Sequence, residues 1–277
     1  MSADKTPVAA TDPTVAPSLH RLAGMALRNG VLVIGPTYWA AAVRTDDGQI
    51  HTASRKRPTV SSRVDRIPAL RGPVKLTEMM LVLPALRRAL PQARLSFESR
   101  GVLGSTVLGS AASKLLARRL GTGLVAELAS SATSLAVLLG VLKGGEIAQY
   151  HGAEHKVIGG YEQGIPAAEA SKEHERCGTH LAVPMLVANA AAIQGVRLLF
   201  PNLAIARLLG IGAGIAASTE LARAMQRGGD TPLKRLVARV GTGLQSVAST
   251  SEPNEQQLEV AEAALAELLR VEPAAAA

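Results

Sequence analysis

Residues 124–142 have the sequence LVAELASSATSLAVLLGVL, and they decide the class of this chain. A helix needs about 20 consecutive apolar residues to cross the hydrocarbon core of a bilayer. This stretch contains one charged residue, Glu127, close to its start, and Lys143 follows its end. Its Ala, Ser and Gly content is typical of membrane helices that pack closely. We therefore interpret the stretch as a membrane helix.

Three further apolar segments have the same character. Residues 181–200 carry only Arg197 near their end, whereas the two weaker segments, 102–120 and 203–224, contain a few more charges. Together the four segments predict a mainly α fold with two helical hairpins in the membrane, 102–142 and 181–224. The alternative is that all four are buried helices of a soluble α-protein.

The distribution of charge also favours a membrane protein. The formal net charge is +8, and Lys and Arg next to membrane helices mark the cytoplasmic side. Most of them lie on the side shared by the N-terminal region, residues 143–180 and the C-terminus, which predicts a multi-pass protein of the cytoplasmic membrane with residues 143–180 inside. Arg118 and Arg119 count against this topology, because they fall at the outer turn. Aromatic residues are only 2% of the chain, so the stacking contacts of nucleic-acid binding are excluded.

The parts outside the apolar segments divide the chain further. Residues 1–18 are rich in Ala, Pro and Thr without an apolar run, which predicts disorder rather than a signal peptide. Residues 19–66 form a β-containing region that ends in a basic linker, residues 54–66. Its apolar runs 31–34 and 38–43 precede the turn Asp46-Asp47-Gly48, which predicts a β-hairpin.

Two more helices are expected outside the membrane. The first lies within residues 67–240, which form the helical, membrane-associated region. Its residues, 76–90, are too short and too charged a stretch to span the membrane, so we expect an interfacial or buried helix. Residues 241–277 hold an amphipathic helix, 255–272, and a tail. The apolar positions that we assign to this helix are Leu258, Ala261, Leu265 and Leu269.

The His-rich segment 150–180 carries the chemistry. Four of the six histidines and the only cysteine lie in it. His151 and His155 are four residues apart and share one face of a helix, with Glu154 between them in the pattern His-x-x-Glu-His. Imidazole, thiolate and carboxylate groups are the ligands of zinc. A single cysteine excludes an intrachain disulfide.

These residues predict a divalent metal site, with zinc as the expected ion. His151 and His155 supply two ligands, and Glu162 or His174 supplies a third. Glu154 is the expected general base, which takes a proton from water beside the metal. Cys177, next to Arg176, is a catalytic nucleophile in this interpretation and a small buried hydrophobe in the alternative. The alternative for the whole motif is a helix with solvated or hydrogen-bonded histidines.

The motifs resemble the DUF1385 family. Tyr150–Ile158 with Tyr161-Glu162 is similar to its central signature, and His174 with Arg176–Thr179 is similar to a second block. Leu244-Gln245 and the residues that follow resemble its C-terminal block, so the resemblance covers roughly residues 22–270. It implies a bacterial, uncharacterised membrane protein with predicted metal dependence. This chain departs from the N-terminal block, with Met25 and Asn29 where the family has Gln and Glu.

Three functions fit these observations. The first is a metal-dependent membrane hydrolase of unknown substrate. The second is a non-enzymatic membrane scaffold or partner-binding protein, in which the cluster is a structural metal site or a polar network and the C-terminal helix contacts a partner or anionic lipid. The third is an ion transporter that uses Glu127 and Glu220. The expected partners are membrane lipid and either another membrane protein or further copies of the chain.

Overall fold

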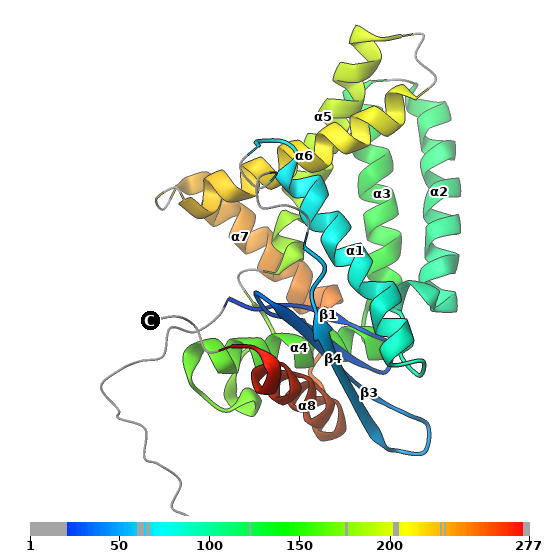
Figure 1. Cartoon of the computed structure of the whole chain (residues 1–277). Coiled ribbons are helices and arrows are strands. Elements are labelled where there is room, and N and C mark those ends of the chain that lie inside the picture. The colour runs from blue at the N-terminus through cyan, green and yellow to red at the C-terminus, as the bar shows by residue number, and fades with distance from the viewer. Residues whose placement is uncertain are drawn as a thin grey trace, which may run out of the picture.

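The chain is mainly helical, with a small antiparallel sheet at its N-terminal end (Figure 1). This computed structural model describes residues 21–59, 64, 67–121, 123–174, 177–201, 205–227, 229 and 231–273. The disorder expected for residues 1–18 lies outside the described residues. The sheet has the order β1-β2-β3-β4, with β1 (Ala23–Ala26), β2 (Gly30–Ile34), β3 (Tyr38–Arg44) and β4 (Ile50–Lys56).

The predicted hairpin is confirmed, and its turn is built as the residues suggest. Gly48 has φ +84°, a left-handed conformation that glycine adopts without strain, and the Asp47 carboxylate accepts hydrogen bonds from the Thr45 hydroxyl and the Gln49 amide. Two details of this region were not predicted correctly. The strand β1 was missed, because a four-residue strand containing Gly24 has almost no alternating pattern. The basic linker was placed too early, because Ser54–Lys56 still pair with β3.

Both faces of the sheet are covered, which explains why β2 is apolar at every position after its first residue. Alternate side chains of β2 and β3 point to opposite faces. Val31, Val33, Ala40 and Ala42 pack against α4 (Glu146–Gln163) and α8 (Glu255–Val271). Leu32 and Trp39 pack on the other face against the second half of α1 (Arg71–Ala89). The helix expected at residues 76–90 is therefore buried along one side.

α8 was predicted as a helix, and three of its four predicted apolar positions face the core: Ala261 is fully buried, and Leu258 and Leu265 are partly buried against it. Leu269 is the exception, because it is 42% exposed, whereas its neighbour Leu268 is fully buried. Val260 and Ala264 are also fully buried, so the centre of the buried face lies beside the predicted one. Most of its apolar side is therefore used inside the protein, and the partner or lipid contact that we considered stays a prediction. Asn254 caps its start.

The four apolar segments all form helices, and they pack in the pairs expected for two hairpins. α2 (Arg100–Leu120) lies along α3 (Leu124–Leu142), and α5 (Ala182–Leu199) lies along α6 (Ala206–Arg227). Among the described residues, only α3 and α5 are long and apolar enough to cross a membrane. The amphipathic helix α7 (Pro232–Leu244) follows α6.

Short helical turns join these parts. The four turns are η2 (Ser96–Glu98), η3 (Ala167–Glu169), η4 (Gly178–Leu181) and the π-helical turn η5 (Gln245–Ser249). The second and third of them, η3 and η4, lie in or at the end of the His-rich segment. They matter for the site because the chain between them returns to α4 and brings Cys177 against it.

Candidate metal centre

α4 forms the floor of the site, and most of the helix is buried. Its glycines allow backbone to approach closely: a Cβ atom at Gly152 would lie 2.1 Å from the Ser251 carbonyl oxygen. The Ser251 amide donates to the Ala148 carbonyl at 2.8 Å. This packing brings the end of η5 against the helix turn that carries His151.

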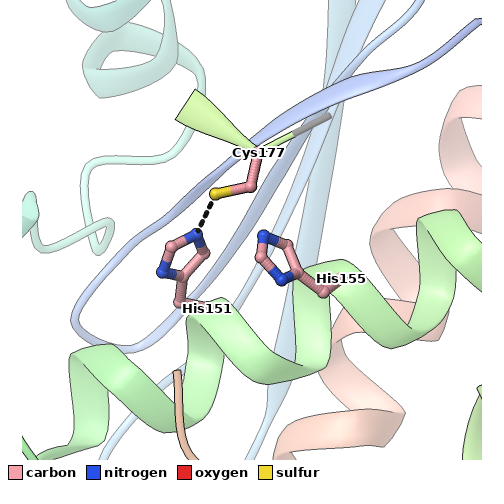
Figure 2. A group of neighbouring side chains, drawn as sticks. All are labelled: His151, His155 and Cys177. Atoms are coloured by element: carbon pink, nitrogen blue, oxygen red, sulfur yellow. Dashed lines mark hydrogen bonds between the residues drawn. The ribbon is translucent and has the colours of Figure 1, made fainter. Parts of the chain in front are cut away.

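His151 and His155 lie on one face of α4, as predicted, with ring centroids 4.4 Å apart. Cys177, which immediately precedes η4, places its Sγ 3.4 Å from Nε2 of His151 (Figure 2). One ligand atom from each of His151, His155 and Cys177 lies within 4.8 Å of the other two. We call these three residues the His-His-Cys cluster.

The outer nitrogens of the two histidines are both bound to backbone. Nδ1 of His151 lies 2.8 Å from the Ser249 carbonyl oxygen, and Nδ1 of His155 lies 2.6 Å from the Lys172 carbonyl oxygen. A carbonyl oxygen only accepts hydrogen bonds, so each Nδ1 carries a proton, and in the neutral imidazole the lone pair then lies on Nε2. This is the arrangement by which proteins fix the tautomer and the ring orientation of metal-binding histidines.

The loop that carries Cys177 is also held in place. The Cys177 amide donates to the His174 carbonyl at 3.1 Å, and the Thr179 hydroxyl lies 3.2 Å from Sγ. The side chain of Gln245, which is fully buried, both accepts from the His174 amide and donates to the His174 carbonyl. Gln245 also bonds His180, which lies in η4 at the start of the next helical segment.

Glu162 and His174 lie beside the cluster but outside it. The Glu162 carboxylate is 3.1 Å from Nε2 of His174, and the ring of His174 lies 5.7 Å from that of His155. We predicted one of these two residues as the third ligand. Among the described residues, it is Cys177, to which we had given a nucleophile's role, that lies within reach of both imidazoles.

Glu154 is buried on the same helix, with Oε2 4.0 Å from Nε2 of His151. A Cβ atom at Gly24 in β1 would lie 2.4 Å from Oε1 of Glu154, so only glycine leaves room there for the carboxylate. Burial raises the pKa of Glu154 to about 7, although the electrostatic interaction with His151 opposes the shift.

Burial and contact also change the pKa values within the cluster. Burial lowers the pKa of His155, which favours the neutral imidazole that binds metal. Burial alone would raise the pKa of Cys177, but interaction with His155 and the hydrogen bond from Thr179 outweigh it and lower that pKa. Both shifts favour the protonation states of ligands.

The cluster opens into a cavity of about 500 Å³. Its polar end is formed by the cluster, Glu154 and His174, and its walls are apolar. Leu142, the last residue of α3, lines it, so the cavity lies where the apolar helix ends. The apolar part of the wall also includes Leu22, Met25, Met79, Ile147 and Ile158.

Several residues of the site were not found by sequence reasoning. The Ser249 and Lys172 carbonyls leave no sequence signal, because every residue has one. Gln245 was quoted only as part of the C-terminal block of the resemblance. Of the two departures from that resemblance, Met25 lines the cavity, whereas Asn29 binds the Arg44 carbonyl and the Arg94 amide and so joins the sheet to the segment after α1.

Comparison with known proteins confirms the resemblance. Residues 135–271 match the family described as "Protein of unknown function (DUF1385)", and this range contains the whole His-His-Cys cluster. The chain is 34% identical over 134 residues to the "Uncharacterized protein YqhQ" of Bacillus subtilis (strain 168). That alignment covers 45% of this chain and 41% of the relative, so the chain spans less than half of the relative's length. No solved structure matches the chain.

Proposed function

We propose, on the premise of the DUF1385 match over residues 135–271, that this chain is a metal-dependent hydrolase of the cytoplasmic membrane. The observation that carries the proposal is the convergence of two imidazoles and one thiolate, with both outer nitrogens bound to carbonyls. A metal is the simplest reason for three buried or half-buried ligand groups to face one another with their lone pairs inward.

The donor set fits zinc. Zinc binds imidazole nitrogen at about 2.0–2.1 Å and thiolate at about 2.3 Å, and tetrahedral geometry then separates N and S by about 3.6 Å. The distance of 3.4 Å between His151 Nε2 and Cys177 Sγ is close to this value. Three protein ligands and one position for water or substrate are typical of catalytic rather than structural zinc sites.

Within this proposal, each residue of the chain has a defined task. Zinc supplies an activated water and a Lewis acid for a carbonyl or phosphoryl oxygen. Glu154 accepts the proton of the attacking water and later returns it to the leaving group. Thr179, Ser249 and Lys172 orient the three ligands, and the cavity walls keep bulk water away from the reacting groups.

The membrane placement rests on the apolar helices. α3 and α5 are long enough to span, and α2 and α6 accompany them with outward apolar side chains such as Val107, 71% exposed, and Leu208, 67% exposed. In this topology four helices cross the membrane, and the sheet with α4 lies on the cytoplasmic side. Only residues 143–145 separate α3 from α4, which keeps the metal centre at the membrane surface.

Metal analysis of the purified full-length protein tests the metal site. We expect about one zinc per chain in the wild type, the stoichiometry of a single three-ligand site, and its loss in the double variant His151→Ala, His155→Ala. His51→Ala is the matched control, because His51 lies in β4, away from the cluster. Equal metal content in the double variant and the control would overturn the site.

Replacing Glu154 by Gln tests catalysis separately. The change keeps the size of the side chain and removes the base, so we expect full zinc content but loss of zinc-dependent hydrolysis of ester, amide or phosphoester probes. The alternative is a structural metal in a membrane scaffold, which the burial of the cluster favours. This alternative predicts that Glu154→Gln changes only the stability of the protein. A Glu154→Gln variant as active as the wild type would contradict the role of Glu154 as general base.

A further inference from the structure

A second cavity, of about 810 Å³, lies among α2, α3 and α5, away from the metal centre. α2 and α3 run antiparallel, since Gly109 contacts Ser134 while Gly101 approaches Val141. The residues of the cavity therefore belong to the end of the bundle where α3 begins and α5 ends, opposite the sheet. Its wall includes Arg118, next to the turn between α2 and α3.

The charges around this cavity do not balance. Arg197 of α5 binds the buried carboxylate of Glu127 at 2.5 Å. Lys114 and Arg118 also line the cavity, and they are four residues apart on one face of α2. Two like charges at this spacing repel each other. With three cations and one carboxylate in its wall, the cavity has a net charge of +2.

The outer surface of the helices next to the cavity is apolar. Leu115 of α2 is 58% exposed and Val125 of α3 is 72% exposed, and both lie at the same end of the bundle as the cations. Serine side chains supply hydroxyl groups within, with Ser110 and Ser131 in the cavity wall. A ligand that fits has an anionic head that accepts hydrogen bonds and an apolar tail that lies against the helices.

We infer that this cavity binds the phosphate headgroup of an anionic phospholipid, with its acyl chains along the outer faces of α2 and α3. Lys114 and Arg118 bind the phosphate, and Arg197 is held nearby by Glu127. This site also accounts for Arg118 at an outer turn, where the usual orientation rule disfavours positive residues. It depends on the membrane placement of the bundle but not on the metal or on hydrolysis.

Lipid binding to the delipidated full-length protein in detergent tests the site. Phosphatidylglycerol is titrated by native mass spectrometry beside phosphatidylcholine with the same acyl chains. We expect phosphatidylglycerol to bind more tightly, and the double variant Lys114→Gln, Arg118→Gln to bind it about 25-fold more weakly, about fivefold for each cation near an anionic lipid. Both side chains are exposed, so the helix keeps its fold, which circular dichroism checks.

Arg119→Gln is the matched control. Arg119 is also exposed and is adjacent to Arg118, but it lies outside the cavity wall, so this variant should bind like the wild type. Equal losses in the double variant and the control would overturn the site, as would equal affinity for the two lipids. Excess inorganic phosphate should leave the lipid bound. Complete displacement would show a site for free phosphate and overturn the lipid assignment.

Discussion

The candidate metal centre and the helical bundle of α2, α3, α5 and α6 are built in opposite ways. Around the metal centre, backbone and side chains interlock: Ala153 is fully buried, and the buried amide of Gln245 is bound from several sides. In the bundle, large apolar side chains point outward, and Leu199 is 74% exposed. The first region buries its apolar groups inside the protein, whereas the second presents many of them on its outer surface, a pattern typical of helices that face lipid.

The largest expected effect comes from leucine truncation in the two regions. Leu32→Ala removes a fully buried side chain from the sheet core and should destabilise by about 2–5 kcal/mol. Leu108→Ala truncates an outward side chain of α2, 60% exposed, and should change stability by less than about 0.5 kcal/mol. Thermal unfolding in detergent measures both. Similar losses would remove the distinction between the regions.

The second largest effect is the pH dependence of stability that Glu154 causes. The pKa of Glu154 is about 7 in the folded protein, above its ordinary 4.5, so the folded state binds more protons and loses stability as pH rises from 4.5 to 7. In the metal-free protein, Glu154→Gln should therefore raise stability by up to about 3 kcal/mol at pH 8, and the gain should vanish near pH 5. Unfolding at both pH values measures it. A gain independent of pH would contradict the buried carboxyl.

Glycine-to-alanine changes give the third comparison, because the two regions should respond with opposite signs. Gly152→Ala forces a Cβ against Ser251 and should lower the free energy of unfolding by about 1–3 kcal/mol. It should also weaken metal binding, because η5 moves away from His151. A Cβ at Gly104 in α2 meets nothing within 4 Å, so Gly104→Ala should stabilise by about 0.5–1 kcal/mol. Stability and zinc titrations measure both. A neutral Gly152→Ala would show that α4 and η5 are not tightly packed.

The smallest effect concerns the polar contacts within the bundle. The Ser113 hydroxyl donates to the Ser130 carbonyl at 2.7 Å and lies 2.8 Å from the Ser134 hydroxyl, which joins α2 to α3. Hydrogen bonds between membrane helices contribute about 0.6 kcal/mol on average. Ser113→Ala should therefore lower the melting temperature slightly and leave zinc content unchanged. A loss of several kcal/mol would indicate a water-excluding soluble core instead.

Local patterns were enough to predict much of the fold. The turn Asp46-Asp47-Gly48 predicted the β3–β4 hairpin because its chemistry is local, and the apolar runs predicted the helices of the bundle because length and composition decide them. The position of α8 on the sheet was different. The predicted positions Leu258, Ala261 and Leu265 do pack there, but the close approach of sheet and helix also buries Ala264, a small residue that carries little hydrophobic signal.

The site was predictable only where its residues share one helix. His151 and His155 face the same way because a helix turn places them so. Cys177 reaches them through the loop between η3 and η4, which has no periodic pattern, so spacing could not distinguish it from Glu162 or His174 as a third ligand. The two histidines are held mostly by backbone carbonyls. Because every residue has a carbonyl, the residue types at these positions could not predict their role.

X-ray absorption at the zinc edge of the purified protein is the most direct test of the His-His-Cys cluster. The account predicts one sulfur ligand at about 2.3 Å and nitrogen or oxygen ligands at about 2.0–2.1 Å, with the sulfur contribution lost in Cys177→Ser. A zinc shell without sulfur in the wild type, or an unchanged shell in Cys177→Ser, would contradict it.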